Sequence, residues 1–189
     1  MAAPAFNYTS PVEYLALERV ANEKHELLQG KVSAMAGASF AHNEIASNVF
    51  GNIKNFLRGK SCRIYPSDLR VHIKSKETFT YPDATIICGK PEMLDDHFDT
   101  VTNPSVIIEV MSPSTESKDR GEKFFYYMQI ESLREYLLIG STRMFVQTAK
   151  RQADGSWKFE EITDANAYMP INAIEHKISL KEIYDNVEF

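Results

Sequence analysis

Two short runs of consecutive apolar residues, each next to a carboxylate, constrain the fold more than any other feature of the sequence. Residues 86–88 (IIC) follow Asp83, and residues 106–108 (VII) are followed directly by Glu109. Continuous apolar runs of this length are typical of strands that are covered on both faces. Burying an unpaired charge in such a strand is energetically costly. The two acids therefore predict neighbouring buried strands whose carboxylates share a partner, and a bound cation is the simplest one.

The size and composition indicate one ordinary globular domain. The chain has 189 residues, of which 43% are hydrophobic and 25% are charged. Its net charge of −5 argues against a protein that coats nucleic acid through overall positive charge, because such domains are usually basic. Basic residues nonetheless crowd the section over residues 54–76. We expect a loose tail over residues 1–9 and a single domain over residues 10–189.

The sequence carries no signal for export or for a membrane. The N-terminus lacks the basic end and apolar run of a signal peptide, and no stretch reaches the roughly 20 apolar residues of a membrane span. Cys62 and Cys88 are the only cysteines, which is too few for a disulfide framework or a zinc pattern. We therefore expect a soluble cytoplasmic protein in which both cysteines are buried thiols rather than a bridge.

The N-terminal third predicts a helix, a hairpin and a second helix. Ser10, Pro11 and Glu13 have the order of a capping box with proline at the first helical position. This helix is predicted to end within residues 21–24, with an apolar side made of Val12, Leu15, Leu17 and Val20. A hairpin is predicted around Gly30. Apolar residues three and four apart then predict an amphipathic helix over residues 40–57.

The rest of the chain alternates strands with helices. Four strand-like segments come in succession, over residues 62–65, 69–74, 81–88 and 105–111. The segment over residues 89–103 is predicted to be a polar surface loop. Four further elements are predicted: a helix over residues 116–129, a strand over 135–139, a hairpin around Asp154-Gly155 and a short helix over 179–184. This order predicts an α/β (α+β) fold with a mixed sheet, flanking helices and added antiparallel hairpins.

Asp83 and Glu109 meet only if their strands are neighbours in suitable register, because successive side chains of a strand point to opposite faces. If they meet, they supply two hard oxygen donors, and the backbone carbonyl of Val110 supplies a third. This set suits Mg²⁺ (or Mn²⁺), since magnesium takes few protein ligands and keeps several waters. The metal would relieve the repulsion between the carboxylates and stabilise charge on a phosphoryl oxygen.

Lys123 and Asp119 are four residues apart in a predicted helix and therefore share one face. An ammonium beside the two carboxylates orients a water or neutralises a charged transition state, and Asp119 holds the lysine or reaches the metal through water. Structural interpretations stay open. Glu109 and Lys123 also suit a buried ion pair, Asp119 suits the first turn of a helix, and His42 suits a structural histidine.

The sequence resembles the Uma2 family of "putative endonucleases", within the PD-(D/E)XK nuclease superfamily, in three stretches: YPDATIICG, NPSVIIEVMSPSTESKDRGEKFFYYMQIESLREYLLIG and, upstream, HELLQGKVSAMAGASFAHNEIASNV. The resemblance covers residues 10–185. It implies a restriction-endonuclease-like domain that hydrolyses phosphodiester bonds in DNA with Mg²⁺ or Mn²⁺ and acts as a homodimer. Two alternatives remain: a catalytically silent binding or regulatory module of the same fold, and metal-dependent phosphoryl hydrolysis on another substrate.

The resemblance also implies roles for individual residues. Asp83 and Glu109 match the metal carboxylates, and Lys123 matches the catalytic lysine. Glu26 matches an acidic position in the first hairpin, and Asp68 one in the strand before Asp83. The sequence departs from the superfamily pattern at Met111, because the usual lysine lies two residues after the second carboxylate. It departs from the family pattern over residues 136–140 (YLLIG), where relatives carry a tryptophan and an aspartate after the tyrosine.

Overall fold

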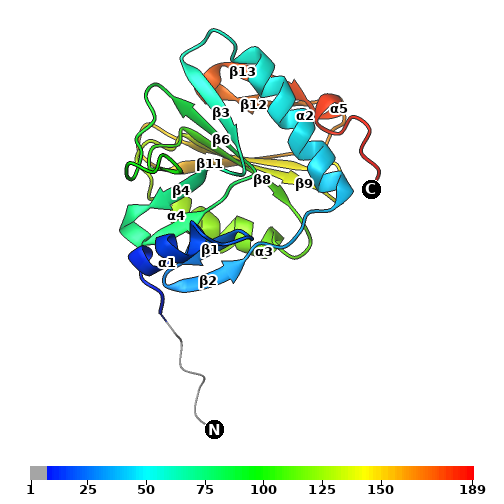
Figure 1. Ribbon diagram of the computed structural model, residues 1–189. Helices are drawn as coiled ribbons and strands as arrows, with labels where there is room; N and C mark the ends of the chain where they lie inside the picture. The colour runs from blue at the N-terminus through cyan, green and yellow to red at the C-terminus, as the bar shows by residue number, and fades with distance from the viewer. Residues whose placement is uncertain (1–7) are drawn as a thin grey trace.

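Two mixed β-sheets form the frame of the computed structural model, which describes residues 8–189 (Figure 1). The larger sheet has the order β11-β10-β9-β8-β6-β3, with bounds β3 Cys62–Pro66, β6 Ala84–Cys88, β8 Val106–Met111, β9 Glu135–Gly140, β10 Val146–Arg151 and β11 Trp157–Ile162. The smaller sheet has the order β2-β1-β5-β4-β7, with bounds β1 His25–Leu28, β2 Lys31–Ala34, β4 Arg70–Ile73, β5 Thr78–Thr80 and β7 Thr100–Val101. The pairs β8–β9 and β4–β7 are parallel, and the other neighbours are antiparallel.

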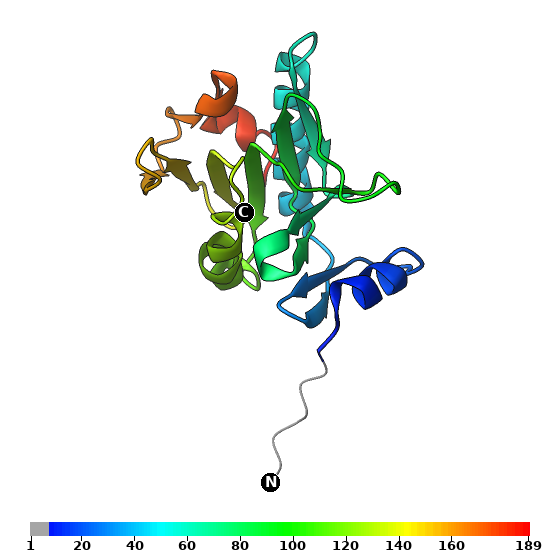
Figure 2. The same cartoon turned by 90° about the vertical axis from the view of Figure 1, so that its left-hand side faces the viewer.

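Helices cover both faces of the larger sheet, as Figures 1 and 2 show. One face carries α2 (Phe40–Phe56), α5 (Leu180–Ile183) and the hairpin of β12 (Tyr168–Ile171) and β13 (His176–Ser179). The other face carries a helical segment made of α3 (Glu116–Lys118), the π-helical turn η2 (Asp119–Lys123) and α4 (Phe124–Tyr127). The remaining elements are α1 (Pro11–Glu18) and two 3₁₀ turns, η1 (Lys74–Lys76) and η3 (Asn172–Ile174).

Strand β8 has apolar side chains in the cores on both faces. Ile108 packs in the core under α2 with Ile45, and Ile107 packs in the core under α4 with Tyr127. All six residues of β8 are buried. The continuous apolar run therefore does mark a strand covered on both faces, and the predicted mixed sheet with flanking helices is confirmed.

The N-terminal elements form where the sequence predicts them, but α1 uses a different face. Ser10 and Glu13 make the capping box, and Gln29 and Gly30 have the positive φ angles of a tight hairpin turn. The predicted apolar side of α1 is wrong, because Val12, Leu17 and Val20 are exposed. The helix packs through Tyr14, whose ring lies 5.1 Å from that of Phe79 in β5, and through Glu18, which accepts a hydrogen bond from the N–H of His25 in β1. The helix also stops at Glu18, earlier than predicted.

Cys62 and Cys88 form a disulfide, which corrects the prediction of two free thiols. The two residues are register partners of the antiparallel pair β3–β6, with Cα atoms 4.0 Å apart. Strand pairing therefore brings the sulfurs together, and a count of cysteines contains no information about that pairing. Within the described residues no free cysteine remains.

One segment predicted as loop, and one for which no element was predicted, are strands. Thr100 and Val101 form β7, which is buried and pairs in parallel with β4, so residues 89–103 are not wholly a surface loop. Residues 78–80 form β5, also buried. Of the predicted tail, residues 1–7 lie outside the described part, and the backbone N–H of Thr9 donates to the carbonyl of Gly30. No helix within residues 8–189 combines the length and apolar character that a membrane crossing requires.

Candidate active site

Strand register places Asp83 directly across from Glu109. Strands β6 and β8 are antiparallel neighbours, and their ladder ends at the pair Ala84 and Ile108. Continuing this register by one residue brings Asp83 opposite Glu109, and residues in direct opposition share one face of a sheet. The predicted condition for a joint site, neighbouring strands in suitable register, is therefore met.

Pro82 explains why the ladder ends there. The same register would place Pro82 opposite Val110, and proline has no N–H to donate to the Val110 carbonyl. The N–H of Val110 donates instead to Oδ2 of Asp83 at 2.7 Å. The N–H and C=O of one residue point to the same edge of an extended strand. The Val110 carbonyl therefore faces the edge where Asp83 lies, as a backbone ligand at this position requires.

The ammonium of Lys123 lies at the centre of a buried group of carboxylates. Its Nζ is 2.8 Å from Oε1 of Glu26, 3.0 Å from Oε1 of Glu109 and 3.6 Å from Oδ1 of Asp119. These four residues are each at most 6% exposed. Burial lowers the pKa of Lys123, but the three acids outweigh it and raise this pKa well above its ordinary value. The lysine is therefore a permanent cation at this position.

Glu109 is held by two donors on one oxygen. Its Oε1 accepts hydrogen bonds from Lys123 and from the hydroxyl of Tyr127 at 2.9 Å, and that hydroxyl also lies 3.0 Å from Oγ1 of Thr80. Among residues 8–189, no donor lies within hydrogen-bonding range of its Oε2. Burial raises the pKa of Glu109, the charge of Lys123 opposes this shift, and the charges of Asp119 and Asp83 add to it.

Glu26 comes from the smaller sheet and ties β1 to the helical segment. Its Oε2 accepts a hydrogen bond from Lys118 at 3.0 Å, and its Oε1 accepts a weak one from the Tyr81 N–H at 3.4 Å. Burial alone would raise the pKa of Glu26, but the charges of Lys123 and Lys118 outweigh it and lower the pKa. Glu26 is therefore ionised at neutral pH.

His42 closes the group from the N-terminal end of α2. Ser39 caps this helix by accepting a hydrogen bond from the His42 N–H, which fixes the ring beside β6. Nε2 of His42 lies 3.0 Å from Oδ1 of Asp83. Burial lowers the pKa of His42, but the hydrogen bond and charge of Asp83 outweigh it and raise the pKa.

The donor set fits a small, hard cation better than a soft one. Oδ1 of Asp119 is buried and accepts no hydrogen bond within the described residues, and burial raises the pKa of this acid. No group of three or more His, Cys, Asp or Glu residues in residues 8–189 has the arrangement of a full metal cage. Magnesium needs no such cage, because one or two carboxylates and several waters suffice. Asp83, Glu109 and the Val110 carbonyl meet that smaller requirement.

The structure brings six of the predicted residues to one place and leaves one outside. The cluster contains the side chains of Glu26, His42, Asp83, Glu109, Asp119 and Lys123. Asp68 lies in the turn between β3 and β4, is 82% exposed and pairs with Lys24 at 2.5 Å. The assignment of Asp68 as an outer acid of the cluster is therefore not supported by its position.

Two residues of the site escaped the sequence analysis. Tyr127 binds Glu109, and Lys118 binds Glu26. The spacing of Asp119, Lys123 and Tyr127, each four residues from the next, is the signal that identifies Tyr127 as part of the same helical face. Lys118 has no such signal, because a lysine in the first turn of a helix is ordinary surface composition.

Comparison with known proteins identifies the family. The Uma2 family, described as "Putative restriction endonuclease", matches residues 11–181. The chain belongs to the Uma2 family. Two relatives from Synechocystis sp. (strain ATCC 27184 / PCC 6803 / Kazusa) match most of the chain. The "Uncharacterized protein slr1290" is 37% identical over 80% of this chain and 79% of the relative, and the "Uncharacterized protein sll1609" is 36% identical over 82% of this chain and 88% of the relative.

A solved structure shows the same fold. It is the crystal structure of "a putative nuclease belonging to DUF820" from Anabaena variabilis ATCC 29413, which matches with a TM-score of 0.76 over 93% of this chain and 97% of that chain. At 16% sequence identity this likeness shows the fold alone. The description of the Uma2 family supports a nuclease-like function.

Proposed function

We propose that this Uma2 protein is a metal-dependent endonuclease that hydrolyses phosphodiester bonds in DNA. One observation supports this proposal above the others. Continuing the β6–β8 register by one residue places Asp83 opposite Glu109 at the point where Pro82 ends the ladder, so two carboxylates and one backbone carbonyl lie at the end of this ladder. A sheet needs no such arrangement for stability, because two facing carboxylates repel each other.

Some residues of the site would bind the metal ion, and others would position the reacting groups. Asp83, Glu109 and the Val110 carbonyl would hold a Mg²⁺ or Mn²⁺ ion, which supplies a more acidic bound water and stabilises charge on a phosphoryl oxygen. Lys123 places a fixed positive charge 3.0 Å from Glu109, where the charge of a phosphoryl group would develop. Tyr127 holds the Glu109 carboxylate in one orientation.

Lys123 also takes the place of the strand lysine. The superfamily position two residues after Glu109 is Met111, which is buried in the core under α4. Lys123 comes instead from η2 and brings its Nζ within 3.0 Å of Glu109. Its contact with Asp119 is the longest of the three at 3.6 Å. We propose that this contact is released first when the ammonium turns towards a substrate phosphate.

Cleavage of supercoiled plasmid DNA with MgCl₂ tests the proposal. Asp83→Asn should slow cleavage by about 10²–10³-fold, the loss typical of removing one preorganised electrostatic group. Asp68→Asn is the matched control, because it removes an exposed aspartate outside the cluster, and it should cleave like the wild type. Full magnesium-dependent cleavage by Asp83→Asn would overturn the assignment.

The silent module remains the second candidate, and one observation favours it. Lys123 has three carboxylate partners within the protein, as a purely structural ion-pair cluster requires. Isothermal titration calorimetry separates the two functions, because the silent module predicts no heat of Mg²⁺ or Mn²⁺ binding. Metal binding with hydrolysis of a non-DNA phosphodiester only would indicate another substrate. The homodimer stays a prediction, which sedimentation equilibrium tests.

A further inference from the structure

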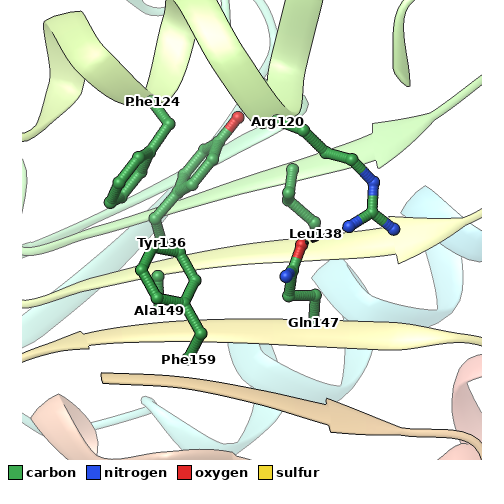
Figure 3. A pocket seen from close by; sticks show the side chains of 7 residues that line it. All are labelled: Arg120, Phe124, Tyr136, Leu138, Gln147, Ala149 and Phe159. Carbon is green, nitrogen blue, oxygen red and sulfur yellow. Dashed lines mark hydrogen bonds between the residues drawn. The ribbon is translucent and has the colours of Figure 1, made fainter. Parts of the chain in front are cut away.

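A small cavity of about 90 Å³ lies beside the candidate active site, between the helical segment and strands β9–β11 (Figure 3). Figure 3 shows aromatic rings on one side of it and polar groups on the other. The aromatic side consists of Phe124, Tyr136 and Phe159, and the polar side consists of Arg120 and Gln147. None of these residues has a role in the proposed hydrolysis.

Strand register creates the hollow. Tyr136, Ala149 and Phe159 form one row across β9, β10 and β11. Ala149 is a small residue between two large aromatic residues, so the centre of the row leaves space unfilled. Leu138 and Gln147 form the next row, in which Gln147 places its side-chain amide beside this space. The cavity therefore follows from one small side chain at a position where a strand normally carries a larger one.

The aromatic wall is rigid but open to solvent. Phe124 stacks on Tyr136 at a centroid distance of 5.7 Å and makes a T-shaped contact with Phe159 at a centroid distance of 5.2 Å. Phe159 is nevertheless 50% exposed. A half-exposed aromatic ring that is held in place on one side offers its other face to a planar ligand.

The charges around the polar wall exclude ions as occupants. Arg120 donates to Glu116 at 2.9 Å and to Oε1 of Gln147 at 2.6 Å. The carboxylate of Glu116 balances the guanidinium, which leaves little attraction for an anion, and the guanidinium itself repels a cation. Because Oε1 of Gln147 accepts from Arg120, its side-chain amide group can still donate. The wall suits a neutral planar group with hydrogen-bonding atoms along its edge.

The volume of the cavity limits the size of the ligand further. Drug-sized ligands fill about 300–1,000 Å³, so this cavity is too small for them. One water occupies about 30 Å³ of liquid, and the cavity is therefore about the size of three waters, or of one substituted six-membered ring. A single nucleobase is neutral and planar and carries donors and acceptors along its edge.

The cavity is also at a suitable distance from the cluster. Leu138, which lines it, is the β9 register partner of Glu109, and Arg120 and Phe124 each directly follow a cluster residue in sequence. Neighbouring strands are about 4.8 Å apart, so Gln147, two strands from Glu109, lies about 10 Å from it. A base within a nucleotide or two of the reacting phosphate can reach that position only when it is out of the base stack.

We propose that this cavity binds one unstacked nucleobase of the substrate strand, against Phe124 and Phe159, with its edge hydrogen-bonded by Gln147. This inference rests on the proposed function and refines its substrate to single-stranded or locally unpaired DNA. Base stacking on an aromatic residue is sequence-tolerant. At the size of one six-membered ring, the site therefore selects an unpaired base and favours a pyrimidine over a two-ring purine.

Fluorescence anisotropy with a labelled single-stranded deoxyoligonucleotide, measured in EDTA, tests the site without any cleavage. Phe159→Ala should weaken binding by about 5- to 150-fold, the range for losing one stacked base. Ala149→Leu should weaken it as well, because the added side chain fills the cavity. Tyr168→Ala is the matched control, since Tyr168 is 49% exposed on the separate β12–β13 hairpin, and it should bind like the wild type.

A second oligonucleotide, with abasic positions throughout, identifies what is bound. If the cavity holds a base, Phe159→Ala and the wild type should bind this probe equally. The inference would be overturned if Phe159→Ala lost the same affinity for the abasic oligonucleotide as for the one with bases. It would also be overturned if Phe159→Ala and Ala149→Leu both bound like the wild type. Neither result would affect plasmid cleavage or the proposed function. If both cavity variants bind the oligonucleotide more weakly but the wild type does not cleave plasmid DNA, the base-binding site is supported and the proposed nuclease activity is refuted.

Discussion

Replacing Lys123 by methionine is the most direct probe of the cluster, because it removes one charge and keeps the length of the side chain. The change leaves Glu26, Glu109 and Asp119 in a buried site without the one cation that contacts all three, and only Glu26 keeps a lysine partner, Lys118. Removing one partner of a buried ion pair costs about 3–5 kcal/mol. We expect a loss of that size in the free energy of unfolding.

The loss is large compared with the stability of such a domain, which is about 5–15 kcal/mol. In a chain of this length each kcal/mol lowers the Tm by about 2–4 °C, so the expected decrease is about 6–20 °C. The assay is urea unfolding followed by circular dichroism at pH 7 in EDTA. The double variant Lys123→Met/Glu109→Gln should recover part of the loss, because a neutral amide replaces one unpaired carboxylate.

Lys118→Met provides the control. Lys118 is 31% exposed and has one carboxylate partner, Glu26, and an ion pair of this kind is worth about 0–1 kcal/mol. If Lys123→Met is destabilised by no more than Lys118→Met, the buried lysine does not neutralise the cluster in the way that the distances indicate.

Two further predictions concern stability away from the cluster. The hydrogen bond from Arg19 holds the pKa of Asp99 at about 2, below its unfolded value of about 3.9. Its stabilisation should therefore be fully present above pH 4 and lost as the pH falls from about 4 to about 2. The stability difference between wild type and Asp99→Asn in urea should shrink over that range, and a constant difference would contradict the ion pair. The disulfide joins residues 26 apart, so replacing both Cys62 and Cys88 by serine should cost about 3.5 kcal/mol by loop entropy, and a loss below about 1 kcal/mol would show that strand pairing alone holds β3.

Most of the fold could be predicted from periodicity, and the exceptions have physical reasons. The run over residues 40–57 and the hairpin around Gly30 carry local signals that tertiary contacts do not change. Strands β5 and β7 are short and gain their stability from neighbours distant in sequence, so their local signal is weak. The buried face of α1 depends on what covers it, which is β5 at Tyr14 and β1 at Glu18.

The candidate site was predictable where chemistry and secondary structure coincide. A glutamate inside an apolar strand, such as Glu109, is improbable without a partner, and the proline before Asp83 marks where the strand pairing stops. The cross-strand disulfide and the exposure of Asp68 depend on three-dimensional placement instead. Neither a cysteine count nor an acidic position in sequence reports which residues lie opposite each other.

The π-helical turn at Asp119–Lys123 affects which differences in length homologues can have in this helical segment. A π turn contains one residue more than the α-helical turn it replaces, and it therefore records a single insertion. Each residue of an α-helix turns the chain by about 100°. Deleting Gly121 would leave seven residue steps from Asp119 to Tyr127, about two full turns of an ordinary helix, so both side chains should stay on one face. Lys123 and Tyr127 would also remain four residues apart, so a homologue that lacks the extra residue should keep both side chains directed at the carboxylate that corresponds to Glu109.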